Sequence, residues 1–96
     1  RLLSPASVAV MTKLHTAGIK AGHNPGTGFG LAWEVVQSEQ GELNLWSIGS
    51  YGHGGAFGTH GWIDPAKNLV AVFLIQGDAP PTVKYSFLNL AGAAVQ

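Results

Sequence analysis

The segment YGHGGAFGTHGWIDPAKNLVAVFLIQ, residues 51–76, carries most of the information about the fold of this chain. A glycine-rich stretch leads through the sequence DPAKN into an apolar run at residues 69–76. In DPAKN, Pro65 fixes φ at the second turn position and Asn68 tolerates a left-handed backbone, so we predict a hairpin turn. The run 69–76 shows no polar alternation, which indicates a central strand with both faces buried.

Further extended segments are predicted on the N-terminal side of this turn. Gly49 and Gly52 predict a bulge or bend within them, and the sequence SEQGE at 38–42 predicts a turn. The predicted extended segments are residues 29–37, a second strand from Leu43 to about Ser50 that bends into 53–57, and residues 59–63.

A helix is predicted at each end of the chain. LLSPASVAVMTKLHTAG has Ser4 as the N-cap, Pro5 at the first helical position and Gly18 as the C-terminal cap. Its apolar face is predicted to hold Val8, Met11, Leu14 and His15. The closing helix is expected to start at a Thr82 cap, with an apolar stripe of Val83, Phe87, Leu90, Ala91 and Ala94. We therefore predict an α+β fold, an antiparallel sheet of three to four strands flanked by both helices, which lie on one side or one on each face.

The composition excludes several classes of protein. The 96 residues carry five basic and five acidic side chains and no cysteine. A nucleic-acid-binding surface needs clustered basic residues, and a membrane helix needs about 18 apolar residues in succession, so neither partner is predicted. No cofactor is predicted either. The low charge and the start at Arg1 lead us to expect a single partial domain at residues 1–96, a piece of something longer.

The sequence His53-Gly54-Gly55-Ala56 is unusual for a strand, because glycine in a strand interior loses packing. Two glycines in succession are tolerated where a neighbouring backbone or a ligand must approach closely. One interpretation is a bulged edge strand that crosses a helix. The other is an edge that presents its backbone to a ligand beside the imidazole of His53.

The remaining histidines give weaker signals. His53, His60 and Asp64 are conceivable metal ligands, but their spacing fixes no geometry, and we predict no metal site. Asp64 precedes a turn proline, where we expect it to accept backbone hydrogen bonds. His15 and His23 are interpreted as a helix-end residue and a loop residue without a catalytic role.

The stretch GHGGAFGTHGWIDPAKNLVAVFLIQ resembles the C-terminal part of the serine β-lactamase and penicillin-binding protein superfamily, and most of all its class C-like esterase branch. The resemblance extends upstream through LLSPASVAVMTKLH and GFGLAWEV, and so covers nearly the whole chain. Members carry a third active-site motif, K-T-G, H-x-G or W-x-G, on the strand that borders the active-site cleft. His53-Gly54-Gly55 falls on that motif.

The resemblance implies a role for each motif residue. His53 stands where many members have a lysine that orients catalytic groups and binds a substrate carboxylate, so it is a candidate for catalysis and substrate binding. Gly54 and Gly55 leave room for a substrate along the strand. The backbone N–H of Ala56 corresponds to one of the two donors of the oxyanion hole. The expected substrate is a small acyl compound, an ester or a lactam.

The chain also departs from the superfamily pattern. No serine here begins S-x-x-K, and neither Tyr51 nor Tyr85 begins Y-x-N, although the superfamily needs both motifs for its nucleophile, base and proton relay. We therefore expect a fragment of a serine hydrolase that is inactive alone. The alternatives are a non-catalytic binding or assembly module that kept this sheet, and an unrelated small α+β protein.

The resemblance makes a further prediction about partners. In the superfamily, two N-terminal strands complete the sheet beside the strand that matches residues 69–76. Without them this strand is an exposed hydrophobic edge, which invites pairing with another chain. We expect a homodimer or larger assembly through residues 69–76, or pairing with the missing N-terminal part. No compartment is predicted.

Overall fold

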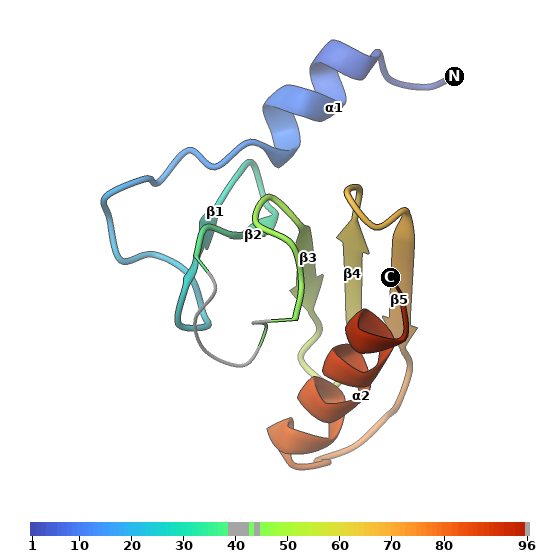
Figure 1. Ribbon diagram of the computed structural model, residues 1–96. Helices are drawn as coiled ribbons and strands as arrows, with labels where there is room; N and C mark the ends of the chain where they lie inside the picture. The colour runs from blue at the N-terminus through green and yellow to red at the C-terminus, as the bar shows by residue number, and fades with distance from the viewer. Residues whose placement is uncertain (39–42, 44, 96) are drawn as a thin grey trace.

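The structure, a computed structural model, describes residues 1–38, 43 and 45–95 (Figure 1). Its strands form a single antiparallel sheet in the order β1-β2-β3-β4-β5. The predicted α+β fold is confirmed, with five strands in place of three or four. The elements are α1 (Pro5–Thr12), β1 (Thr27–Phe29), β2 (Glu34–Val36), β3 (Tyr51–Gly54), β4 (His60–Asp64), β5 (Leu69–Phe73) and α2 (Pro81–Ala94).

The first predicted strand is a hairpin instead. Residues 29–37 were expected to be continuous, but β1 ends at Phe29 and β2 starts at Glu34. A tight turn separates them, in which the N–H of Gly30 donates to the carbonyl of Trp33 at 2.7 Å and Ala32 has a φ of 65°. A left-handed alanine was not predictable from a sequence that contains no turn dipeptide at this point.

The predicted strand from Leu43 to Ser50 is also wrong. The described residues there form successive turns, with Trp46 N–H donating to Leu43 O at 3.1 Å and Ser50 N–H to Ser47 O at 2.9 Å. The turns bring Leu43 and Trp46 into the same core, each 1% exposed, whereas a strand would place two residues three apart on opposite faces. Gly49 has a φ of 87°, so the predicted bend is found there. Residues 39–42 of the predicted turn lie outside the described residues.

Helix α1 is shorter than predicted. Ser4 caps it through Ser7 N–H at 3.1 Å and Pro5 opens it, as expected, but it ends at Thr12 because Lys13 is extended. The chain then runs beside the first hairpin, where the N–H of His15 donates to Phe29 O at 2.8 Å. The predicted helical face through Leu14 and His15 and the cap at Gly18 are therefore wrong, although Gly18 does adopt a left-handed φ of 79°.

Helix α2 covers the sheet with a different face from the predicted one. Leu88 and Gly92 are its buried residues; of the predicted stripe, Ala91 packs against the core, whereas Leu90 is 72% exposed. The reason is the close approach at Gly92, where an added Cβ would lie 3.1 Å from the carbonyl of Leu45. Trp46 stabilises this contact, because its indole N–H donates to Leu88 O at 3.1 Å.

The start of α2 differs from the sequence prediction. Pro80, not Thr82, is the N-cap, so Thr82 lies inside the first turn.

The two helices contact different parts of the sheet. The core between α2 and the sheet contains Val36, Leu43, Trp46, Trp62, Ala71 and Leu88. Val8 and Met11 of α1 instead line a cavity of about 120 Å³ with Tyr51 and Ile63, whose side chains point to the other face of the sheet from Trp62. Helix α2 therefore lies on one face of the sheet, whereas α1 lies beyond the end of the sheet and borders the other face at this cavity (Figure 1).

Strand β5 is an edge strand. The prediction that both its faces are buried is wrong for this chain, since Val70 is 64% exposed and Val72 is 56% exposed while only Ala71 is buried. In Figure 1 it forms the border of the sheet, with no strand beyond it. Within the part of the chain that the structure describes, no helix is long and apolar enough to cross a membrane.

The turn between β4 and β5 is formed as predicted. Asn68 has a left-handed φ of 52°. Asp64 is fully buried and accepts two backbone hydrogen bonds, from Ser47 N–H at 2.9 Å and from Lys67 N–H at 3.2 Å. This one carboxylate therefore joins the hairpin turn to the turns that carry Trp46.

Replacement of Asp64 tests this role. Asp64→Ala leaves two N–H groups without their acceptor, so we expect the free energy of unfolding to fall by about 2–3 kcal/mol in urea denaturation. The exposed Asp78→Ala is the matched control and should change it by less than about 0.5 kcal/mol. Equal effects of the two substitutions would contradict the assignment.

Candidate functional site

The β3–β4 hairpin positions the sequence His53-Gly54-Gly55-Ala56. His53 and Gly54 end β3, opposite Gly61 and His60 of β4. Gly55 continues the pairing, with its N–H donating to Thr59 O at 2.8 Å. The four residues therefore sit at the point where a regular strand pair opens into a turn.

The backbone groups of this segment divide into two kinds. In an antiparallel ladder, hydrogen-bonded and non-hydrogen-bonded residue pairs alternate. The hydrogen bond between Gly55 and Thr59 therefore makes His53 and Gly61 a hydrogen-bonded pair as well. The N–H and C=O of Gly54, which lies between them, point away from β4. Strand β2 starts opposite Gly52, so no described strand faces Gly54 on that side. The N–H of Ala56 has no hydrogen-bond acceptor among the residues that the structure describes.

The first side chain of the motif lies at this opening. His53 is exposed, and its Nδ1 lies 2.7 Å from the carbonyl oxygen of Gly54, so in this contact the ring nitrogen donates. The ring also packs against two aromatic neighbours, with centroid distances of 5.6 Å to His23 and 6.1 Å to Phe29. These contacts hold the imidazole beside the free backbone groups.

The glycines of the motif have structural neighbours of their own. A Cβ on Gly54 would lie 3.0 Å from Nδ1 of His60, and one on Gly55 would lie 2.1 Å from Oγ1 of Thr59. The pairing of β3 with β4 has no bulge, so the bulge of the first interpretation is wrong, whereas His53 and Gly54 do lie beyond the part of β3 that pairs with β2. Close packing of the hairpin on itself accounts for part of the glycine content.

A polar cavity of about 290 Å³ adjoins the motif. Its wall contains residues 53–56 on one side and six ionisable or polar side chains from elsewhere in the chain, those of His23, Asn24, Glu34, His60, Lys84 and Tyr85. The sequence analysis missed Glu34, Lys84 and Tyr85 as site residues and considered His60 only as a metal ligand. One feature of the sequence could have indicated Lys84 and Tyr85 as site residues, namely their position in the first turns of the closing helix.

Glu34 is fixed at the base of this cavity. It is 1% exposed, and its Oε1 accepts hydrogen bonds from Asn24 N–H at 3.1 Å, Asn24 Nδ2 at 2.7 Å and Thr27 Oγ1 at 2.7 Å. The hydroxyl of Tyr85 donates to Asn24 Oδ1. A single network thus ties α2 and the loop before β1 to this carboxylate.

His60 is the most perturbed group of the site. It is 4% exposed, stacks on Trp62 at 5.4 Å, and neither ring nitrogen has a hydrogen-bond partner among the described residues. Burial, followed by the positive charge of Lys84, lowers the pKa of His60 from 6.5 to about 4, against an opposing effect of Glu34. His60 is therefore neutral at neutral pH and presents one donor and one acceptor.

Lys84 brings a positive charge to the same place. Its Nζ lies 3.7 Å from the position that a Cβ on Gly54 would take, and 5.2 Å from the ring centre of Tyr85. An ammonium group from α2 is thus beside the motif, whose own first residue is a histidine. No ion pair to Lys84 is formed by the residues at 1–38, 43 and 45–95.

The other candidate ligands of the sequence analysis are dispersed. Asp64 lies at the opposite end of β4 from His60, and its carboxylate serves Ser47 and Lys67. Across the described residues, no three His, Asp or Glu side chains are grouped to hold a metal ion. The imidazole of His15 instead lies 2.7 Å from the carbonyl of Val10.

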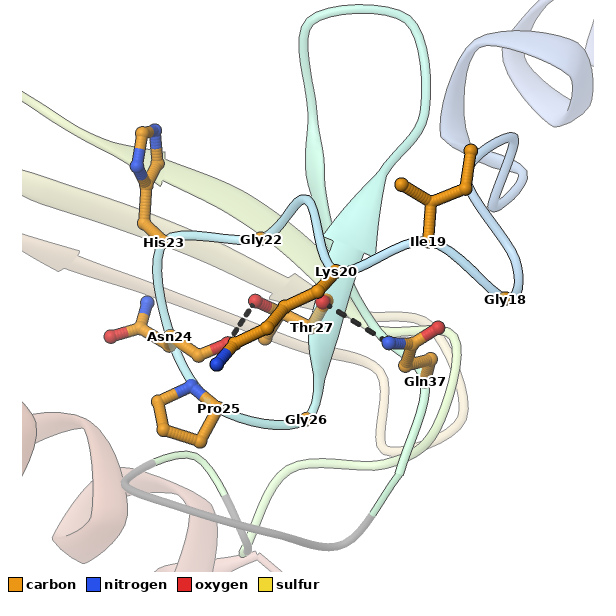
Figure 2. Close-up of a pocket in the computed structure, with 10 residues that line it drawn as sticks. All are labelled: Gly18, Ile19, Lys20, Gly22, His23, Asn24, Pro25, Gly26, Thr27 and Gln37. Carbon is orange, nitrogen blue, oxygen red and sulfur yellow. Dashed lines mark hydrogen bonds between the residues drawn. The ribbon is translucent and has the colours of Figure 1, made fainter.

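A larger cavity of about 450 Å³ adjoins the loop before β1 (Figure 2). Figure 2 shows its border, where Lys20 extends across the loop and Gln37 Nε2 donates to Thr27 O at 3.2 Å. It shares His23 and Asn24 with the cavity beside the motif but contains no residue of 53–56. We therefore assign the candidate site to the smaller cavity.

The comparison with protein families covers almost the whole chain. The model of the family described as Beta-lactamase matches residues 1–94. This range includes both helices, all five strands and the cavity beside residues 53–56. No curated protein matches the chain.

The low pKa of His60 predicts a pH dependence of stability. Above pH 6.5 the imidazole is neutral in both states; as the pH falls, the unfolded chain takes up a proton at about 6.5 and the folded chain only at about 4. His60 should therefore lower the free energy of unfolding by about 2 kcal/mol between pH 6.5 and pH 5. His60→Asn should remove this part of the slope, as measured by urea denaturation at each pH.

A direct titration serves as the control for that experiment. The ring C–H resonances of His60, followed by NMR in the folded protein, should have a midpoint near pH 4. A midpoint near 6.5 would show that the imidazole is solvated and that its burial here is wrong.

Proposed function

The chain belongs to the β-lactamase family, and from this premise we propose that it forms the substrate-facing wall of an acyl-transfer site whose nucleophile lies outside these 96 residues. The family places the chain among serine-hydrolase-like proteins. We propose in addition that residues 53–55 are the third active-site motif of the family, that the nucleophile is not among these residues, and that the isolated chain is inactive.

The observation that carries this proposal is the free N–H of Ala56. Acyl transfer through a tetrahedral intermediate requires hydrogen-bond donors aimed at the developing oxyanion, and fixed backbone amides are well suited to this. The amide of Gly55 is used in the hairpin, whereas that of Ala56, one residue further, has no acceptor among the described residues and borders a polar cavity. We assign Ala56 N–H as one oxyanion donor.

The rest of the motif has matching roles. His53, exposed at the rim and fixed by its contact with Gly54 O, is assigned to orient the acyl substrate. Gly54 presents a backbone N–H that faces no described strand, and a C=O that accepts from His53 Nδ1, along which the substrate can lie. Gly55 keeps the strand close to Thr59, so that the next amide is directed away from the ladder.

No nucleophile accompanies these groups. The sequence has no S-x-x-K, and no serine of the described residues lines the cavity beside the motif. Ser50, the serine next to β3, is fully buried and accepts a hydrogen bond from the indole of Trp62 at 3.0 Å. The chain alone should therefore bind an acyl compound without forming an acyl-enzyme.

We favour a carboxylic ester as the substrate and the class C-like esterase branch as the subgroup. The motif begins with a histidine here, where many members have a lysine. It is thus similar to the H-x-G form of the motif that esterase-like members carry.

An assembly module that kept the sheet but lost catalysis is the second candidate. The observation in its favour is the exposed apolar edge of β5, with Leu74 at 77% exposure just beyond the strand. On this hypothesis residues 53–56 have no ligand, and the reading frame upstream of Arg1 encodes no S-x-x-K.

The proposal predicts binding without turnover. In a ¹⁵N NMR titration with the unactivated ester ethyl butyrate, shifts should concentrate on the amides of residues 54–56. Incubation with p-nitrophenyl butyrate and with a chromogenic cephalosporin should give no enzymatic hydrolysis and, by intact mass with peptide mapping, no acyl group on a serine.

A pair of substitutions separates the amide from its surroundings. Ala56→Pro removes the N–H, so the shifts at residues 54–55 should disappear, while Ala56→Gly keeps the N–H and should retain them. Unchanged chemical shifts elsewhere in the spectrum confirm that both variants are folded. Retained binding in Ala56→Pro, or a serine acyl adduct in the wild-type chain, would refute the assignment.

A further inference from the structure

The hydrogen bond between His53 and the next carbonyl fixes where the imidazole carries its proton. Nδ1 of His53 lies 2.7 Å from the carbonyl oxygen of Gly54. A carbonyl oxygen can only accept, so in the neutral ring the proton is on Nδ1 and Nε2 carries a lone pair. Both partners are adjacent residues of β3. The bond therefore does not depend on what packs beside the strand.

Two neighbouring rings hold the imidazole in this orientation. His23 meets the ring of His53 edge-on, with 5.6 Å between ring centres, and Phe29 lies at 6.1 Å. His23 also packs edge-on against Phe29 at 5.3 Å, so the three rings form one cluster. A half-turn of the His53 ring would place a C–H group against Gly54 O and lose the hydrogen bond. The direction of Nε2 is therefore fixed as well as its lone pair.

The lone pair at Nε2 decides which ligand groups can lie against it. His53 is exposed and borders two cavities, the one of about 290 Å³ beside the motif and a second of about 280 Å³. A lysine at this position would only donate hydrogen bonds, whereas Nε2 of the neutral ring only accepts them. A carboxylate also only accepts, so it finds no donor at this atom. A hydroxyl group does fit, because it can donate.

The positive charge of the site lies on the other side of β3. Side chains alternate along a strand, so the imidazole of His53 and a side chain on Gly54 would point to opposite faces. Nζ of Lys84 lies 3.7 Å from the position that a Cβ on Gly54 would take, on the face that α2 covers. Lys84 therefore brings charge to one face of the strand, and His53 brings an acceptor to the other.

We infer that His53 accepts a hydrogen bond at Nε2 from a hydroxyl group of the ligand, so that the substrate suited to this site is an ester that carries a free hydroxyl. The residue thus determines specificity through an acceptor and not through a charge. The acceptor at Nε2 stands on the hydrogen bond to Gly54 alone. The choice of an ester as the ligand rests on the proposed function.

NMR of the histidine side chains tests the position of the proton. Long-range ¹H–¹⁵N correlation spectra at about pH 8.5, where the neutral ring is observed, should show His53 protonated on Nδ1. His15 is the internal control, because its Nε2 lies 2.7 Å from the carbonyl oxygen of Val10 and should carry the proton on that nitrogen instead. A proton on Nε2 of His53 would overturn the inference.

Two matched pairs of esters test the ligand in ¹⁵N NMR titrations at the same pH. Ethylene glycol monobutyrate and propyl butyrate differ by a hydroxyl in the alcohol part, and ethyl lactate and ethyl propionate by a hydroxyl in the acyl part. The ratio of dissociation constants within a pair should favour the hydroxyl ester by about 2- to 10-fold more in the wild type than in His53→Phe. We expect this for the pair whose hydroxyl reaches Nε2.

His53→Phe keeps a ring beside His23 and Phe29 but has no acceptor, and His15→Phe is the matched control that should keep the wild-type ratio. Equal ratios in the wild type and His53→Phe for both pairs, or loss of the preference in His15→Phe as well, would overturn the inference. If no ester binds although His53 carries its proton on Nδ1, the proposed acyl site is refuted and the hydroxyl ligand with it, while the acceptor at Nε2 stands.

Discussion

The close approach of β4 to the glycines of β3 is the constraint on which the rest of this structure depends. A Cβ on Gly52 would lie 2.1 Å from the carbonyl of Gly61 and 2.4 Å from the indole of Trp62. The missing side chain lets Trp62 lie across β3, fully buried, with its N–H bonded to Ser50. Leu88 of α2 and Trp46 then complete the core around that indole. The glycine-rich sequence therefore specifies the centre of the fold as well as the site.

The same hairpin explains why the candidate site has its particular chemistry. Pairing with β4 uses the amides of His53 and Gly55 and leaves those of Gly54 and Ala56 directed elsewhere. On the α2 side, the space left by Gly54 is filled by the neutral imidazole of His60, with the ammonium of Lys84 beside it. Donors of fixed direction and a nearby positive charge suit the stabilisation of a developing negative charge. They supply no nucleophile, and the chain has none in the family's pattern.

Sequence reasoning succeeded where local chemistry decides structure and failed where tertiary packing decides it. The turn at Pro65 and Asn68, the Ser4 cap and the hydrogen-bonding role of Asp64 follow from local backbone preferences. The buried face of α2 does not, because the contact of Trp46 with Leu88 O selects it over the more apolar stripe. For the candidate site, residues 53–56 could be selected from the sequence alone, whereas Glu34 and Lys84 line the same cavity from elements distant in sequence.

Residue-resolved hydrogen exchange of the ligand-free chain tests the central claim most directly. If the hairpin leaves the motif amides as the structure has them, Gly55 N–H, bonded to Thr59 O, should be protected, and Ala56 N–H should exchange near its intrinsic rate. Equal protection of the two amides would mean that Ala56 already has an acceptor. An oxyanion donor at that position would then be excluded.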